Sequence, residues 1–267
     1  MCGLLGMSSR YPARLTSSLM SLAAHAGGSS RNSDGWGIAL YDERDVAVFR
    51  EAGRASESPL VQLLLAGGPC TTLALGHIRH ATQGARTLAN TAPFTRELAG
   101  RMHVFAHNGN LHGIDLSLAS GSFQPIGETD SEHAFCALLG KLEALNISAD
   151  MPTLKQRLDL IASFAIELRK LGPANFMYAD GDVLFAHADR RLQVDTGLVA
   201  PPALYLWQTP AMSPAQQPTD ISPDAGIAQQ QVTLIASVPL ACEGWQPMKE
   251  GEIIAVRSGE ILETLFI

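Results

Sequence analysis

Cys2 is the residue of this chain whose place in the sequence points most directly to chemistry. Removal of Met1 would leave a thiol and a free α-amine on the same residue. A thiol becomes a strong nucleophile when a base takes its proton, and an α-amine titrates at about 7.7 to 8.0 in model peptides. Cys2 would then carry its own general base. The alternative is a small apolar side chain at the start of a buried strand.

A second candidate, Arg79, lies where an apolar stretch ends and a loop containing Thr82 and Gly84 begins. A guanidinium at a strand end can bind a carboxylate through two parallel hydrogen bonds. An arginine that is solvated or ion-paired is the alternative for this position.

Two further motifs place polar groups where they can meet a ligand. Asn108 and Gly109 follow a predicted strand, and a side-chain amide next to a glycine N–H is suited to stabilising an oxyanion; an ordinary Asn-Gly turn is the alternative. Asp130 lies in the first turn of a predicted helix, where its carboxylate could hold an ammonium group. Thr129 and Glu132 instead match the capping-box pattern of a helix N-terminus, in which the Glu132 side chain would bond back to the cap. Together these motifs indicate a site for a small amino acid.

The elements that must position these residues are mainly short strands. Apolar runs and apolar-polar alternation predict strands at residues 2–7, 36–41, 46–51, 72–79, 102–107, 175–179, 183–188, 252–256 and 261–266. The spacing of apolar residues predicts helices at 16–26 and 57–65, from Thr129 onward, and from Thr153 to Gly172. Asp-Gly and Ser-Gly turns join the last four strands into two hairpins.

Composition limits the classes of function that the chain can have. Its 267 residues, 46% of them apolar, are enough for one large domain or two small ones. The net charge of −7 and the lack of a basic cluster predict neither a nucleic-acid nor a membrane partner. The absence of a signal-peptide pattern and of paired cysteines favours the cytoplasm. We expect Cys70, Cys136 and Cys242 to be buried apolar residues without disulfide bonds.

The eight histidines raise the question of a metal site. His77 and His80 are three residues apart, and His103, His107 and His112 lie on one predicted strand and its loop. Alternate strand positions and the lack of paired cysteines or nearby acidic ligands make a closed metal site difficult to assemble. We therefore expect no metal and no cofactor.

Six short segments, taken in chain order, resemble those of the class II glutamine amidotransferases, which are N-terminal nucleophile (Ntn) hydrolases. The segments are residues 2–3, 32–37, 79–82, 90–93, 107–109 and 129–132. Residues 236–240, together with Trp245 and the Gly251-Glu252 pair, are similar to a stand-alone, YafJ-type branch of this family.

The resemblance implies an α+β fold, a four-layer αββα sandwich of the Ntn-hydrolase type with two antiparallel sheets between layers of helices. It also implies a single glutamine amidotransferase type 2 domain over residues 2–267. Residues 208–231 are rich in Pro, Gln, Ala and Ser and carry few apolar side chains. We predict a flexible surface insertion there.

The same resemblance implies a role for each candidate residue. Cys2 would attack the side-chain amide of glutamine, with its own α-amine as the general base. Asn108 and the Gly109 N–H would stabilise the oxyanion. Arg79 would bind the substrate α-carboxylate and Asp130 the α-ammonium.

The loop after Arg79 both supports and modifies this expectation. Thr82 would support the loop and so contribute to substrate binding. His80 and Gln83 stand where better-known members of the family often carry Trp and His. We therefore expect a different pocket lining.

Three functions are consistent with these observations. The first is a glutaminase that releases glutamate and ammonia through a Cys2 thioester, with a synthase as partner protein. The second is a γ-glutamyl amidohydrolase that acts on a conjugated γ-glutamyl metabolite or dipeptide, because no synthase motif follows the site. The third is a non-catalytic subunit that binds glutamine. The retained Cys2, Arg79, Asn108 and Asp130 favour an enzyme with a small-molecule substrate.

Overall fold

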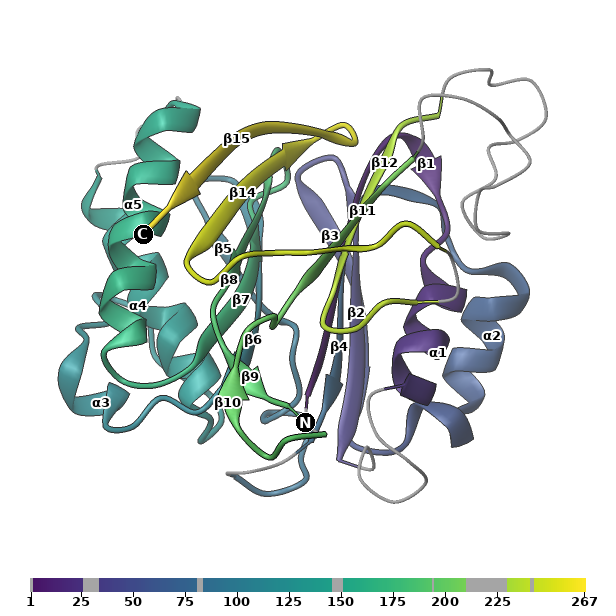
Figure 1. The fold of residues 1–267 in the computed structure, drawn as a ribbon, viewed down its shortest axis with the longest axis horizontal. Coiled ribbons are helices and arrows are strands. Elements are labelled where there is room, and N and C mark those ends of the chain that lie inside the picture. Colours follow the sequence, from purple (N-terminus) through teal and green to yellow (C-terminus); the bar gives the residue numbers. More distant parts are fainter. Residues whose placement is uncertain are drawn as a thin grey trace.

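Two antiparallel sheets lie face to face in this protein (Figure 1). The computed structural model describes residues 2–25, 34–80, 84–145, 151–193, 195–209, 230–240 and 243–267. Within these ranges the first sheet has the strand order β13-β11-β12-β1-β4-β2-β3. Its strands are β1 Gly3–Ala13, β2 Gly35–Asp42, β3 Asp45–Glu51, β4 Thr71–Arg79, β11 Tyr205–Gln208, β12 Val232–Ala236 and β13 Gln246–Pro247.

The second sheet has the order β15-β14-β8-β7-β6-β5 in the described part of the chain. Its strands are β5 Phe94–Leu98, β6 Arg101–Gly109, β7 Ala174–Ala179, β8 Leu184–Ala188, β14 Glu252–Arg257 and β15 Glu260–Phe266. A short ribbon pairs β9 Arg191–Leu192 with β10 Val199–Ala200.

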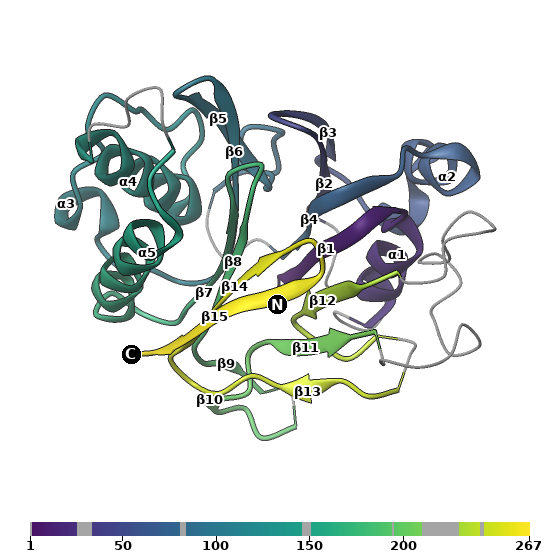
Figure 2. The ribbon, with the colours of Figure 1, turned by 90° about the horizontal axis from the view of Figure 1, so that it is seen from above.

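Helices cover the outer face of each sheet (Figure 2). The second sheet is covered by α4 Asp130–Ala144 and α5 Leu154–Arg169, and the short α3 Ile114–Ser117 packs against α4. The first is covered by α1 Thr16–His25 and α2 Pro59–Gly67, with the 3-10 turn η1 Ala55–Glu57 before α2. This order of layers confirms the predicted αββα sandwich.

Strand alternation sorts the core side chains into two clusters. Leu4 and Leu75 belong to the cluster that lies between the sheets and beneath α4 and α5, whereas Leu5 and Met7 belong to the cluster under α1 and α2. Phe105 of β6 stacks on the ring of Phe135 in α4, with ring centroids 5.5 Å apart. By the same alternation Cys2, two residues before Leu4, is directed to the space between the sheets.

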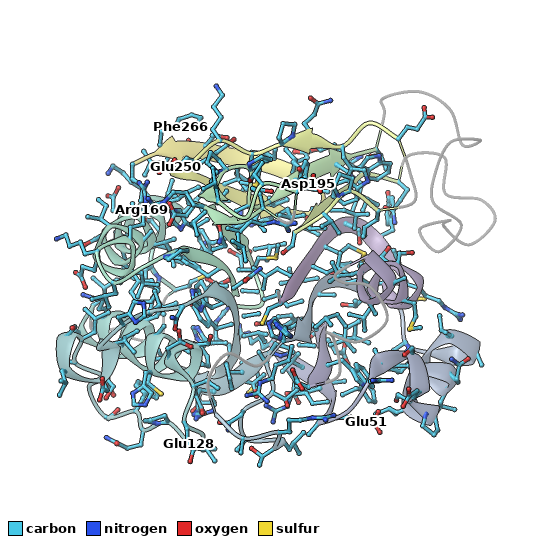
Figure 3. All side chains as sticks on the ribbon, turned by 60° about the horizontal axis from the view of Figure 1, so that its bottom comes forward. Glu51, Glu128, Arg169, Asp195, Glu250 and Phe266 are labelled. Carbon is cyan, nitrogen blue, oxygen red and sulfur yellow. The ribbon has the colours of Figure 1, made fainter. Side chains whose placement is uncertain are left out.

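Ion pairs at the end of α5 link this helix to the strands beside it. Arg169 Nη2 lies 2.7 Å from Glu250 Oε1, and its Nε lies 3.0 Å from Asp189 Oδ1. Arg169 Nη1 also donates to the Ile267 carbonyl at 3.1 Å. A cation at a helix C-terminus interacts favourably with the helix dipole. Figure 3 shows Arg169 and Glu250 at the same edge of the molecule, near the end of β15.

The predicted elements all occur, with ends that differ by a few residues. The first strand continues past residue 7 to Ala13, because β12 supplies pairing partners as far as Ser9 and β4 pairs with Ala13. Thr153 and Gln156 form a capping box at the predicted start of α5, but α5 ends at Arg169, before the predicted stop. Strands β5 and β9 to β13, and helix α3, were not predicted.

The cap of α4 differs from its prediction in one detail. Thr129 Oγ1 accepts the Glu132 N–H at 3.3 Å, as the N-cap pattern predicts. The Glu132 carboxylate does not return to the cap; it accepts the Gly127 N–H at 2.7 Å and pairs with Arg96 at 2.6 Å. The negative charge of this buried side chain is therefore used to join the loop before α4 to β5.

Other expectations concern the surface and the chain as a whole. Of the predicted insertion at 208–231, residues 210–229 lie outside the described part, while Gln208 ends β11. Cys136 is buried, but Cys70 is exposed in the segment that joins α2 to β4, so its predicted burial is wrong. Cys242 lies outside the described residues. In the described part, none of the helices is long and apolar enough to cross a membrane. The single domain over residues 2–267 stays a prediction.

Candidate active site

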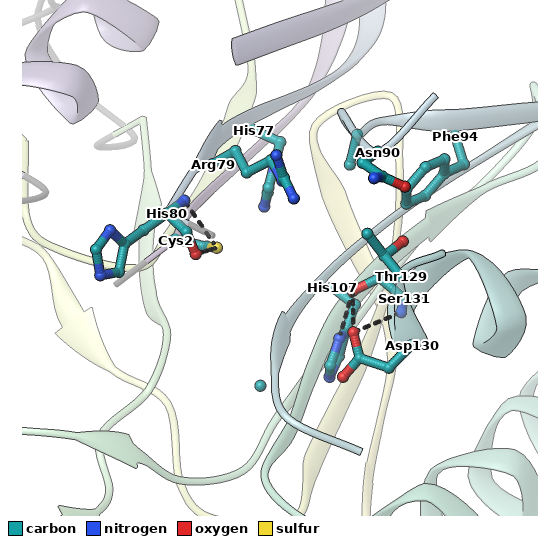
Figure 4. A pocket seen from close by; sticks show the side chains of 12 residues that line it. Cys2, His77, Arg79, His80, Asn90, Phe94, His107, Thr129, Asp130 and Ser131 are labelled. Atoms are coloured by element: carbon teal, nitrogen blue, oxygen red, sulfur yellow. Dashed lines mark hydrogen bonds between the residues drawn. The ribbon is translucent and has the colours of Figure 1, made fainter. Parts of the chain in front are cut away.

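A pocket of about 400 Å³, its open mouth included, lies at the ends of β4 and β6, where the two sheets meet (Figure 4). It is lined by Cys2, His77, Arg79, His80, Asn90, Ala92, Phe94, His107, Gly109, Thr129, Asp130 and Ser131. Four of the predicted site residues are therefore part of one surface. Asn108 joins them through a hydrogen bond to Cys2, while Thr82 and Gln83 lie outside the described residues.

The Cys2 thiol is held by the main chain of His80. Its Sγ accepts the His80 N–H at 3.2 Å and lies 3.3 Å from the His80 carbonyl oxygen, to which the thiol donates. Burial raises the pKa of Cys2, although the His80 N–H and the Arg79 guanidinium oppose this shift. A thiol with a raised pKa stays protonated near neutral pH, so it needs a base before it can attack.

Asn108 connects the two sheets next to the thiol. It is buried at the end of β6, and its Nδ2 donates to the Cys2 carbonyl oxygen at 2.7 Å. The Asn108 carbonyl oxygen in turn accepts a hydrogen bond from Asn175 Nδ2 at 3.0 Å. A side-chain amide has two N–H donors, so one contact with Cys2 uses only half of the donor capacity of Nδ2.

Position 109 requires glycine, because the neighbouring atoms leave no room for a side chain. A Cβ atom built on Gly109 would overlap the Pro173 carbonyl oxygen and lie 2.6 Å from His107 Nε2. The close approach of β7, which pairs Ala174 with Gly109, produces this restriction. Asn108 and Gly109 therefore belong to a strand end, and the alternative of an ordinary Asn-Gly turn is wrong.

Arg79 lies on the pocket wall at the end of β4. Its side chain is buried, and Nη1 and Nη2 donate to the carbonyl oxygens of Ala85 and Gly84 at 3.0 and 3.1 Å. Burial lowers the pKa of Arg79, while Cys2 and Asp34 act in the opposite direction. A guanidinium stays charged under all ordinary conditions, so Arg79 places a buried positive charge beside the thiol.

Asp130 supplies the opposite charge from the first turn of α4. Its Oδ2 accepts the Leu111 N–H at 2.8 Å, and its Oδ1 accepts the Ser131 N–H at 2.8 Å. The helix N-terminus stabilises this carboxylate. A carboxylate has about four lone-pair sites, so Asp130 can accept further bonds from a ligand while these two contacts orient it.

The match to a known family decides the identity of this arrangement. Residues 1–266 match the family model described as class II glutamine amidotransferases. The chain belongs to this family.

Similar proteins agree with this assignment. The chain is 37% identical over 257 residues to a candidate glutamine amidotransferase, YafJ, from Escherichia coli K12; the match covers 94% of this chain and 96% of YafJ. A candidate glutamine amidotransferase from Haemophilus influenzae is 32% identical over 268 residues, which cover 97% of this chain and 85% of the relative. Both matches extend over nearly the whole of this amidotransferase chain.

Solved structures agree as well. A predicted glutamine amidotransferase from Pseudomonas aeruginosa PA01 superimposes with a TM-score of 0.69 at 30% identity, and the match covers 98% of this chain and all of that structure. Glutamine phosphoribosylpyrophosphate amidotransferase from Bacillus subtilis gives a TM-score of 0.62 at 16% identity, with 99% and 49% of the two chains covered. The second likeness shows the fold alone, which is the Ntn-type sandwich of the amidotransferases.

Two pocket histidines of this amidotransferase chain were missed as site residues by the sequence analysis. His77 is buried, and neither of its ring nitrogens has a hydrogen-bond partner among the described residues. His107 Nδ1 lies 2.9 Å from Ser131 Oγ, and its Nε2 lies 3.4 Å from the Pro173 carbonyl oxygen. Since a carbonyl only accepts, the contact with Pro173 places the ring proton on Nε2. His77 could have been found from its position two residues before Arg79, because alternate strand residues share a face.

The burial of His77 predicts a loss of stability in acid. Burial lowers the pKa of His77 to about 3 in the folded protein, against about 6.5 in an unfolded chain. The unfolded chain thus binds one more proton as the pH falls from about 6.5 to about 3, and folding becomes weaker by roughly 1 kcal/mol for each pH unit in this window. Urea unfolding of wild type and His77→Leu between pH 7 and pH 4 should show that the variant loses less of its unfolding free energy.

The control for this prediction is an exposed histidine. His112 lies on the surface of the loop after β6, so His112→Gln should keep the wild-type dependence of unfolding free energy on pH. The interpretation of His77 is wrong if His77→Leu and wild type lose stability in parallel.

Proposed function

We propose that this protein is a glutaminase-type amidohydrolase whose nucleophile is Cys2 after the removal of Met1. The observation that carries the proposal is the presence of Cys2, Arg79 and Asp130 around one pocket, with Asn108 bonded to Cys2. A thiol, a guanidinium, a carboxylate and an amide donor are the groups needed to hold an amino acid and cleave its side-chain amide.

The α-amine of Cys2 is the general base in the proposed reaction. It takes the thiol proton, and the thiolate attacks the amide carbon of glutamine to form a tetrahedral oxyanion. Asn108 Nδ2 and the Gly109 N–H stabilise the negative charge. The α-ammonium of Cys2 then returns its proton to the leaving nitrogen, so ammonia departs and a γ-glutamyl thioester remains. Water attacks this thioester, with the same α-amine as base, and glutamate is released.

The two charged residues bind the opposite poles of the substrate. Arg79 pairs with the α-carboxylate, because a guanidinium has five N–H donors and forms strong hydrogen bonds with a charged acceptor. Asp130 accepts the α-ammonium through the lone pairs that Leu111 and Ser131 leave. Thr82 is proposed to support the Arg79 loop.

The products suggest where the enzyme acts and with which partner. A reduced Cys2 thiol is maintained in the cytoplasm, where we place the protein. Ammonia that is used for synthesis requires an acceptor, and we propose a separate synthase as the partner protein. A γ-glutamyl amidohydrolase requires no such partner, since glutamate and the freed amine are its final products.

Intact-mass spectrometry with 6-diazo-5-oxo-L-norleucine, a glutamine-shaped electrophile, tests the site. We expect a mass without Met1, and a single adduct on Cys2 whose formation glutamine slows. Cys70→Ala is the matched control, because it removes an exposed thiol and should leave the adduct unchanged. A processed chain that forms no adduct, or forms it elsewhere, would contradict the proposal.

Kinetics then identify the substrate. We expect the highest kcat/KM for glutamine in a panel that includes γ-glutamyl anilide and γ-glutamyl dipeptides. A preference for one of the conjugates selects the γ-glutamyl amidohydrolase. Binding of glutamine without turnover by the processed chain selects the non-catalytic subunit.

A further inference from the structure

The side chain of Asn90 joins two loops that meet at the pocket. Asn90 is 3% exposed, although its amide is polar. Its Nδ2 donates to the Ala85 carbonyl oxygen at 3.0 Å, and its Oδ1 accepts the Glu128 N–H at 2.7 Å. One amide group therefore bonds to the main chain of both loops.

On one side, Asn90 acts on the loop that holds Arg79. The Ala85 carbonyl oxygen accepts from Asn90 Nδ2 and also from Arg79 Nη1, each at 3.0 Å. The neighbouring Gly84 carbonyl accepts Arg79 Nη2. The position of the guanidinium thus depends on carbonyl groups that Asn90 holds in place.

On the other side, Asn90 acts on the start of α4. Glu128, whose N–H it accepts, is followed by the N-cap Thr129 and then by Asp130. The Asp130 carboxylate is therefore two residues from the bond that Asn90 makes. Figure 4 shows Arg79, Asn90 and Asp130 around the same pocket.

Both loops have a glycine where they contact the amide. A Cβ atom built on Gly84 would lie 2.9 Å from Asn90 Nδ2, and one built on Gly127 would overlap Asn90 Oδ1. Gly84 also has a φ of +75°, which favours glycine. This close packing on two sides leaves Asn90 little freedom, so it can hold the two loops at a defined separation.

We propose that Asn90 is a positioning residue that sets the distance between Arg79 and Asp130. Arg79 ends β4 of the first sheet, whereas Asp130 begins α4 on the second, so strand pairing within either sheet does not fix their separation. Asn90 thereby selects substrates that carry an α-carboxylate and an α-ammonium on the same carbon. The selection of substrates by Asn90 rests on the proposed function, whereas the hydrogen-bonded link that Asn90 makes between the two loops does not.

The kinetic test compares glutamine with 4-carbamoylbutanoate, which lacks the α-amine, and 4-aminobutanamide, which lacks the α-carboxylate. Wild type should prefer glutamine over both. In Asn90→Ala the preference, as a ratio of kcat/KM values, should fall about tenfold or more, the size of one lost charge-assisted contact. If Asn90 has only a structural role, the kcat/KM values for all three amides fall together and their ratios stay unchanged. That result would overturn the proposed role of Asn90 in substrate selection.

Two further variants provide a control and an alternative for the Asn90→Ala test. Gln230→Leu is the matched control: Gln230 is a buried amide that bonds to the main-chain N–H and carbonyl of Tyr11, away from the pocket, and its loss should leave the ratios unchanged. Gly127→Ala displaces the Glu128 side of the link without removing the amide, and should reduce the ratios if Asn90→Ala does not fold.

Hydrogen exchange tests the link between the loops without any reaction. In Asn90→Ala the Glu128 amide and the main chain of residues 84–91 should both exchange faster than in wild type, and Gln230→Leu should change neither. Unchanged exchange at Glu128 would overturn the proposal even if activity falls. If processed wild type hydrolyses none of the three amides, the proposed function and the selection both fail, and the exchange rates still decide whether Asn90 joins the loops.

Discussion

Cys2→Ala should abolish the release of ammonia from glutamine. The alanine side chain cannot form the thioester, and loss of the nucleophile in comparable hydrolases costs roughly 10⁴-fold or more in kcat. Arg79 and Asp130 are unchanged in this variant, so glutamine should still bind and raise the melting temperature. The measurements are coupled detection of glutamate with time, and thermal unfolding with and without glutamine.

A second variant separates the thiol from its base. Insertion of a lysine between Met1 and Cys2 blocks removal of Met1 and moves the α-amine away from the thiol. We expect activity to fall to the level of Cys2→Ala, because burial raises the pKa of the Cys2 thiol and no α-amine remains beside it to take the proton. Cys70→Ala should keep full activity. Turnover by the extended chain would show that another group is the base.

Asn108→Ala should lower kcat by about 10²- to 10³-fold with a small change in KM, the usual cost of one oxyanion donor. The charge on the oxygen develops only in the transition state, so the lost donor affects the reaction more than the binding of glutamine. Steady-state kinetics over a range of glutamine concentrations separates the two constants.

The isosteric variant Asn108→Asp serves as the control for shape. It keeps the size of the side chain but replaces the Nδ2 donor, which lies 2.7 Å from the Cys2 carbonyl oxygen, with an acceptor. We expect its kcat to be at or below that of Asn108→Ala. A rise in KM with unchanged kcat in both variants would instead assign Asn108 to binding of the ground state.

Local patterns were sufficient to predict most of the elements that carry the site. The hairpins at Gly181 and Gly259 form as the Asp-Gly and Ser-Gly turns indicate, with φ values of +83° and +78°. The helix predicted from Thr153 also begins there, with Thr153 and Gln156 in a capping box. Each of these features depends on residues within a few positions of one another, so the local sequence is sufficient to predict it.

Pairing between distant segments could not be predicted in the same way. The apolar run in the sequence ends at residue 7, but strand β1 continues to Ala13 because β12 and β4 supply its pairing partners. Cys70 shows the opposite case: its apolar side chain predicted burial, but its place in the segment between α2 and β4 exposes it. Whether a residue is buried depends on which distant segments of the chain pack against it.

Motifs in a fixed order are readable from one chain, and they were sufficient to predict the family, the nucleophile candidate Cys2 and the charged candidates Arg79 and Asp130. That these residues share one pocket, that His77 and His107 line it, and that Asn90 bonds to both of its loops became visible with the folded chain. The hydrogen bond that Glu128 donates to Asn90 spans 38 residues, and the one that Asn108 donates to Cys2 spans 106. Contacts of this length arise when two sheets pack face to face, and no local pattern encodes them.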